Sequence, residues 1–129
     1  MITAALALLA ATALSPIADQ PGPADDPDLR CVAAVSFVLG ASDDKQLGVD
    51  RVSGLTAVFM YYLGKVDARR PGLDYAKELG GLMNAPDYAR QLPADLVRCG
   101  KEAEERGAML QRLGEDLKRS VPLAESRPG

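Results

Sequence analysis

The chain of 129 residues contains no histidine, so it lacks the commonest general base and the commonest metal ligand of proteins. Ser-His-Asp and Cys-His catalysis are therefore excluded, and a typical zinc site is not expected. No acid pair or nucleophile–base spacing suited to other chemistry is recognisable. The sequence predicts a protein that is not an enzyme and has no catalytic residue, cofactor or metal. An enzyme that uses carboxylates or Tyr and Lys alone is the less favoured alternative.

Dense positive charge is also lacking. Lys and Arg number 15 against 18 Asp and Glu, which gives a net charge of −3. The isoelectric point is about 4.9, and no basic patch is dense enough to follow a phosphate backbone. The sequence therefore predicts no nucleic-acid partner.

No apolar run is long enough to span a bilayer, which needs about 20 residues. The longest, Ala4–Leu14, has the length of the apolar core of a secretory signal, and small residues follow it as candidate cleavage sites after Ala13 or Ala18. No Lys or Arg precedes the run, so the signal is atypical or the true start lies upstream of Met1. We predict a signal peptide over 1–18, a periplasmic or secreted protein, and no membrane anchor after cleavage.

Export determines how the two cysteines are interpreted. In an oxidising compartment an even cysteine count usually means a disulfide, and two cysteines allow one intramolecular pairing, Cys31 with Cys99. Closing a loop of this length removes about 4 kcal/mol of unfolded-state entropy. Two buried free thiols or an intermolecular bridge are the alternatives.

Proline, glycine and helical periodicity divide the rest of the chain. A Pro-, Gly- and Asp-rich flexible lead is predicted over 19–27, a helical domain over 28–120 and a disordered tail over 121–129. Asp26 is a helix cap, Pro27 suits the first helical position, and Asp28 complements the helix dipole. The first helix, 29–39, is apolar nearly all round and is expected to lie at the centre, covered by the others.

Four further helical segments follow. They are a helix of about 49–70, a short helix over 73–84, one or two turns from Pro86, and a long helix that Pro93 begins and that ends at Ser120. The expected fold is all-α, a small four-to-five-helix bundle closed by one disulfide.

The last helix carries two patterns. Its inward stripe repeats at steps of three and four residues, and Gly100, Gly107 and Gly114 recur beside it every seven residues. Close packing of the Gly54 and Gly64 side of the second helix against this glycine strip is one interpretation, and chance recurrence is the other. The stripe also indicates modest dimer potential, so a monomer or a weak dimer is expected. The stripe positions are Leu96, Cys99, Ala103, Arg106, Leu110, Leu113 and Leu117.

A polar cluster ends the second long helix. Arg forks and Tyr hydroxyls there suit a small anionic ligand or a protein partner. The favoured alternative is a solvated helix end whose cations complement the helix dipole. The candidate polar surface site consists of Tyr61, Tyr62, Lys65, Arg69 and Arg70.

An exported helical domain whose first and last helices each carry one cysteine resembles the HdeA-like acid-stress chaperones of the bacterial periplasm. The residues behind this are Cys31 at the head of the first helix and Leu96–Cys99, LVRC, leading into a charged last helix. The resemblance implies a holdase that exposes apolar surface when its carboxylates are protonated. We therefore predict a non-enzymatic binding or stress-protective role in the cell envelope, with an unidentified protein partner. A small apolar-ligand carrier, with a cavity among Phe37, Phe59 and Met60, is the alternative.

Overall fold

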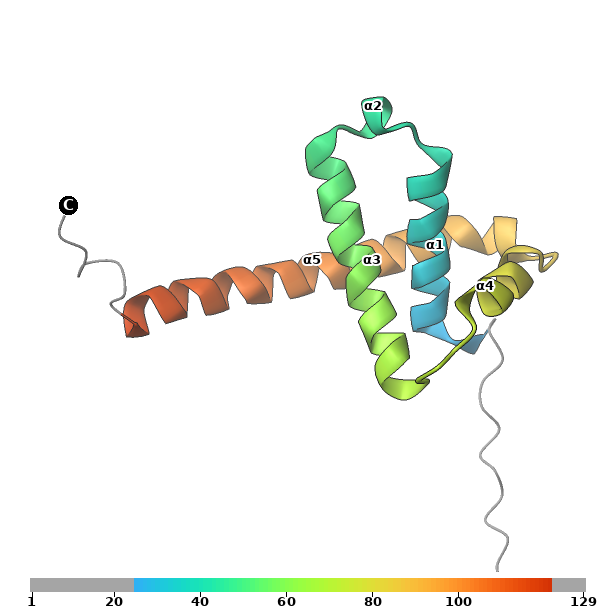
Figure 1. Ribbon diagram of the computed structural model, residues 1–129. Helices are drawn as coiled ribbons and strands as arrows, with labels where there is room; N and C mark the ends of the chain where they lie inside the picture. The colour runs from blue at the N-terminus through green and yellow to red at the C-terminus, as the bar shows by residue number, and fades with distance from the viewer. Residues whose placement is uncertain (1–24, 122–129) are drawn as a thin grey trace, which may run out of the picture.

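The computed structural model describes residues 25–121, and within them it contains five helices and no strand. The helices α1 and α3 run side by side and are joined through the single turn α2, while α5 runs across them and α4 lies beside the lower half of α1 (Figure 1). The expected all-α fold with one disulfide is confirmed; the predicted signal peptide and nearly all of the predicted tail lie outside the described residues. The bounds are α1 Pro27–Ala41, α2 Asp44–Leu47, α3 Val49–Arg69, α4 Tyr75–Met83 and α5 Tyr88–Ser120.

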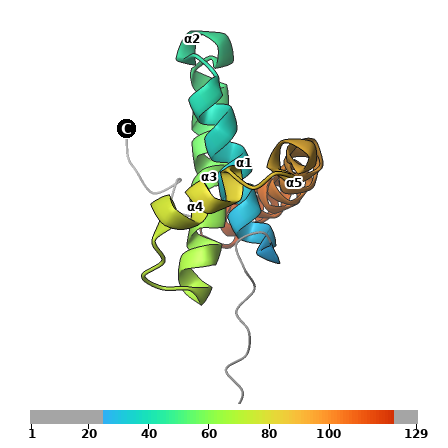
Figure 2. The ribbon, with the colours of Figure 1, turned by 90° about the vertical axis from the view of Figure 1, so that its right-hand side faces the viewer.

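The start of α1 is as the sequence indicates. The Asp26 carboxylate accepts hydrogen bonds from the backbone N–H groups of Asp28 and Leu29, each at 3.1 Å, and Pro27 is the first helical residue. The expectation that the whole helix is covered is wrong beyond Val35, because Phe37 is 47% exposed. Helices α4 and α5 pack only against the first half of α1, and the second half extends past them with α2 and the start of α3 (Figures 1 and 2).

The core is built where α1, α3 and α5 meet. Apolar side chains of α1 pack against Tyr62 and Val66 of α3 and against the disulfide. A second cluster joins Ala33 of α1 to Leu82 of α4 and Tyr88 of α5. The main cluster consists of Leu29, Cys31, Val32, Tyr62, Val66 and Cys99.

The disulfide between Cys31 and Cys99 is present, as predicted. Both cysteines are almost fully buried, and their Cα atoms are 5.6 Å apart. It attaches the head of α1 to the middle of the first half of α5, which are 68 residues apart in the chain. The bond therefore holds together the two helices that are most distant in sequence.

Pro93 does not begin the last helix, and this expectation is corrected. Helix α5 is continuous from Tyr88 to Ser120 and contains Pro93 in its second turn. A proline inside a helix loses one backbone hydrogen bond, at a cost of about 3 kcal/mol. Tyr88 and Leu92 pack against α1 and α4, and this packing favours the longer helix. A prediction from local helix propensity does not include such tertiary contacts.

The close-packing interpretation of the glycine strip is also wrong. A Cβ atom placed on Gly100, Gly107 or Gly114 would meet nothing within 4 Å, and the same holds for Gly54 and Gly64 of α3. Because α5 runs across α3 instead of along it, the two glycine-bearing faces do not meet (Figure 1). The strip is left open.

We expect the disulfide to contribute about 4 kcal/mol to the free energy of unfolding, by the loop-entropy relation. Urea unfolding of the oxidised chain and of the Cys31→Ala/Cys99→Ala variant measures this difference. Treatment with reductant is the control, and it should destabilise only the parent chain. Coincident unfolding curves for the two proteins would contradict the prediction.

Candidate functional site

Charged side chains from three helices gather beside the disulfide, at the head of α1. Asp26 is fully buried and binds the Arg69 guanidinium at 3.1 Å and that of Arg70 at 3.4 Å. The carboxylate that caps α1 therefore also ties it to the end of α3. We call the whole group the ionic cluster, and it consists of Asp26, Asp28, Lys65, Arg69, Arg70 and Glu102.

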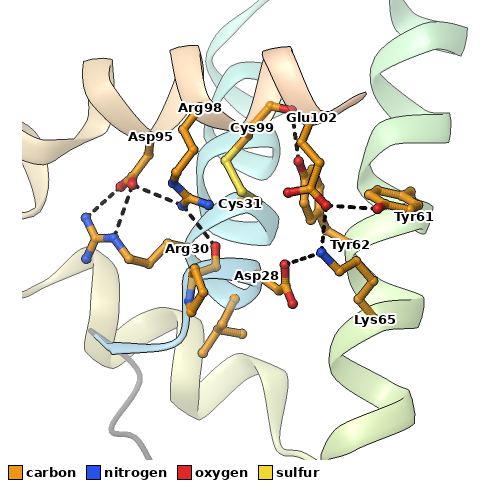
Figure 3. Close-up of a disulfide and its surroundings, with 12 residues drawn as sticks. Asp28, Arg30, Cys31, Tyr61, Tyr62, Lys65, Asp95, Arg98, Cys99 and Glu102 are labelled. Atoms are coloured by element: carbon orange, nitrogen blue, oxygen red, sulfur yellow. Dashed lines mark hydrogen bonds and ion pairs between the residues drawn. A yellow bond between two sulfur atoms is a disulfide. The ribbon is translucent and has the colours of Figure 1, made fainter. Parts of the chain in front are cut away.

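Lys65 lies at the centre of the cluster and bridges all three helices. Its ammonium lies 2.7 Å from Asp28 of α1 and 2.7 Å from Glu102 of α5 (Figure 3). Tyr61 donates a hydrogen bond of 2.9 Å to the same Glu102 carboxylate. The hydroxyl of Tyr62, which is buried, donates at 2.8 Å to the carbonyl of Cys99. A single lysine thus joins α1, α3 and α5 beside their covalent link.

A second ionic contact lies on the other side of the disulfide. Arg30 of α1 binds Asp95 of α5 at 2.6 Å, and both side chains are nine-tenths buried. Arg98 adds a bond of 3.3 Å to Asp95 and donates at 3.0 Å to the carbonyl of Pro27 (Figure 3). The crossing of α1 and α5 is therefore held by ion pairs on both sides of the disulfide.

Two carboxyl groups of the ionic cluster have lowered pKa values. Burial by itself would raise the pKa of Asp26, but the N–H groups at the start of α1 and the Arg69 guanidinium outweigh burial, and the pKa lies below its ordinary 3.8. The Lys65 ammonium, aided by Tyr61, lowers the pKa of Glu102 below 4.5. Each carboxylate therefore stabilises the fold fully above these ordinary values, and the stabilisation is lost as the pH falls through the lower folded pKa.

Two other groups, Lys65 in the cluster and Tyr62 beside it, are held in one protonation state. Burial opposes the charge on Lys65, but the hydrogen bonds to Asp28 and Glu102 outweigh it and raise the pKa of the lysine. Burial, with the nearby Glu102 charge, raises the pKa of Tyr62 to about 12. Near neutral pH the lysine is therefore a fixed cation and the tyrosine a fixed hydrogen-bond donor.

The predicted polar surface residues are brought together, but in two different surroundings. Tyr62 is fully buried in the core, and Lys65, Arg69 and Arg70 face acidic partners from other elements. The sequence indicates Asp26 and Asp28 only as residues at the start of α1 and does not reveal these long-range bonds. The four-residue spacing of Lys65 and Arg69, which puts both cations on one face, was the available signal.

Lys65, Arg69 and Arg70 each bind a carboxylate, so the arrangement is suited to holding helices together. Among residues 25–121 no group of His, Cys, Asp and Glu is placed to hold a metal ion. In the same range, no helix has the length and hydropathy needed to cross a membrane. The ionic cluster is best described as a structural contact that joins α1, α3 and α5.

The surface that the fold leaves open lies on the outer half of α5. The C-terminal half of this helix extends away from the other four (Figure 1). Leu110, Leu113 and Leu117 are 61%, 49% and 52% exposed, and we call these three side chains the leucine face. The stripe predicted on this helix is therefore buried only in its inner half, at Cys99, because the end of α5 extends past the other described helices.

An apolar groove continues the leucine face toward the core. Its volume is about 240 Å³, and it lies where α3 and α5 diverge. Tyr61 takes part in two features, since its hydroxyl binds Glu102 of the ionic cluster and the residue also lines the groove. The groove is lined by Ala57, Val58, Tyr61, Ala103, Arg106, Gly107 and Leu110.

The chain matches no family model, and no curated protein or solved structure is significantly similar to it.

We expect Asp26→Asn to lower the free energy of unfolding at pH 7 by about 2 kcal/mol, the scale of a buried hydrogen bond to a charged group. Because the parent loses the Asp26 contribution in acid, the difference should shrink as the pH falls below 3.8, the ordinary value for Asp26. Urea unfolding across this pH range measures both proteins. Asp87→Asn, in an exposed pair with Arg90, is the control and should change little. A constant difference at all pH values would contradict the assignment.

Proposed function

We propose that the protein is a non-enzymatic binding protein of the cell envelope that protects other proteins under stress. The observation that supports this is the leucine face, three large apolar side chains that the folded chain leaves about half exposed on a helix extending from the core. Contiguous apolar surface of this kind is characteristic of interaction sites. An exposed helical face at steps of three and four residues is also a common way to engage a protein partner.

A holdase is the concrete form of this role. Partly unfolded proteins expose apolar segments, and the leucine face offers apolar surface without prior unfolding. Acid would enlarge this surface, because protonation of Asp26 and Glu102 removes bonds that join α1 to α3 and α3 to α5. The likeness to HdeA-like chaperones supports the same role in an exported protein. Such a holdase should suppress client aggregation below about pH 4, where Asp and Glu side chains become protonated.

A small apolar-ligand carrier is the second candidate. The cavity expected among Phe37, Phe59 and Met60 does not coincide with the apolar groove, because none of these three residues lines the groove. Phe37 and Met60 are 47% and 57% exposed, and Phe59 packs against the core. The groove between α3 and α5 supports this candidate, but its 240 Å³ is below the roughly 300–1,000 Å³ of ordinary ligand sites. Because the groove is smaller than an ordinary ligand site, the holdase is preferred.

We expect Leu113→Glu/Leu117→Glu to abolish most protection of an acid-sensitive client enzyme. Both side chains are exposed, so the substitutions remove apolar surface without disturbing the core. Light scattering of the client below pH 4, at a fixed molar ratio of the two proteins, measures protection.

Val97→Glu is the matched control, because Val97 is an apolar residue of α5 that is 74% exposed but lies outside the leucine face. It should protect as well as the parent. Equal protection by all three proteins would refute the role of this face, and no protection by the parent would refute the holdase.

A further inference from the structure

The apolar groove between α3 and α5 is open because three of its lining residues are small. Ala57 and Ala103 have a single side-chain carbon and Gly107 has none, so the diverging helices leave a space that larger side chains would fill. A Cβ atom placed on Gly107 would meet nothing within 4 Å. The surface that the described residues present to the groove is almost entirely apolar, although Arg106 also lines it.

The side chain of Arg106 has no carboxylate partner among residues 25–121. Its one polar contact there brings a guanidinium nitrogen to 3.8 Å from the sulfur of Met109, which is a weak acceptor. The arginines of the ionic cluster, Arg69 and Arg70, are in contrast bound to Asp26. A guanidinium binds carboxylate or phosphate oxygens through two parallel hydrogen bonds. Arg106 is therefore available to an anion that the described part of the chain does not supply.

A second groove, of about 710 Å³, lies along α5 and is lined mostly by charged residues. Of the described residues that line it, four are basic and two are acidic. One of the acids, Glu102, is already bound by Lys65 from outside the groove, and one of the bases, Arg98, is bound to Asp95. The remaining charges give this groove, which we call the basic groove, an excess of positive charge. They are Lys101, Arg106 and Arg112 against Glu105.

The apolar groove and the basic groove meet at Arg106, which lines both. We propose that together they bind a single-chain amphiphile with an anionic head. Its hydrocarbon tail lies in the apolar groove, and its head is bound by Arg106 with the help of the other cations of the basic groove. The 240 Å³ of the apolar groove is too small for a whole ordinary ligand, but a cavity of about 150 Å³ already holds benzene, so it accepts a short chain.

The lining determines the class of ligand. A cationic head would be repelled by the remaining positive charges, and a neutral head would gain no ion pair with Arg106. An anion without a tail would gain nothing from the apolar groove, where burial contributes about 25 cal/mol per Å². An apolar lining with a few polar groups that fix orientation is the ordinary composition of a ligand site. Carboxylate and phosphate heads both suit the guanidinium, so the shared chemistry is that of an anion on an aliphatic chain.

This inference deepens the second candidate function, the small apolar-ligand carrier, by naming its ligand class, and it does not depend on the holdase. Leu113 and Leu117, which carry the holdase prediction, line neither groove. The two activities can therefore be separated by substitution.

NMR chemical-shift titration of the purified, oxidised chain at pH 7 tests the site with four probes of equal chain length. Octanoate or octyl phosphate should bind saturably and shift the amide signals of residues 103–110. Octanol should bind about tenfold more weakly and octylammonium more weakly still, because the ion pair with Arg106 is lost. Failure of both anions to bind, or binding of octanol or octylammonium as tight as that of octanoate, would overturn the inference.

Gly107→Leu locates the tail, because the new side chain fills the space that the glycine leaves and should abolish binding of the anions. Gly114→Leu is the matched control. It makes the same change at another glycine of α5 with open surroundings, outside both grooves, and it should bind like the parent. Both substitutions favour helix formation equally, and circular dichroism verifies that the fold is kept. Equal binding by the two variants would overturn the location.

Arg106→Gln locates the head and should weaken octanoate binding about tenfold while leaving octanol binding unchanged. Arg119→Gln is its control, since Arg119 is an exposed arginine of α5 that pairs with Asp116 and lines neither groove. An equal effect of the two substitutions would refute the role of Arg106.

The holdase and the amphiphile site fail separately. Gly107→Leu keeps the leucine face, so it should protect a client as well as the parent while it loses octanoate binding. Octanoate binding that fails in the parent refutes the amphiphile site alone, and client protection that is insensitive to Leu113→Glu/Leu117→Glu refutes the holdase alone.

Discussion

The fold depends on the attachment of the head of α1 to α5 through the Cys31–Cys99 disulfide. The helical region has few large apolar residues at its centre, and its main cluster is built around the two cysteines. Ion pairs lie on both sides of the bond, Lys65 with Glu102 on one side and Arg30 with Asp95 on the other. A covalent link surrounded by charged contacts thus does what a larger apolar core does in other domains of this size.

The same attachment explains why the protein has an open surface. Because α5 runs across α1 and α3, these helices can cover only its inner half (Figure 1). The outer half keeps the three- and four-residue spacing of apolar side chains, with Leu110 and Leu117 more than half exposed. A helix that begins as part of the core therefore ends as an exposed apolar surface, so one element contributes both to the stability of the fold and to its open face.

Acid acts on the stability of the joints between helices and not on the leucine face itself. The carboxylates with lowered pKa values, Asp26 and Glu102, hold α1 and α5 to α3, so their protonation weakens the joints between helices. The leucine face contains no titratable group of its own. A stress role would combine a face that is exposed at all pH values with a core that loosens only in acid.

Local chemistry in the sequence determined the helical class, the cap at Asp26, the limits of α3 and α4, and the pairing of two cysteines that had no other intramolecular choice. These follow from propensities and hydrogen bonds within a few residues, or from simple counting. The direction of α5 across the other helices, the burial of Tyr62, the long-range partners of Asp26 and the exposure of Leu110 were decided by the tertiary structure. A stripe of leucines has the same spacing whether or not another helix covers it, and only the packing of the whole chain determines which part stays open.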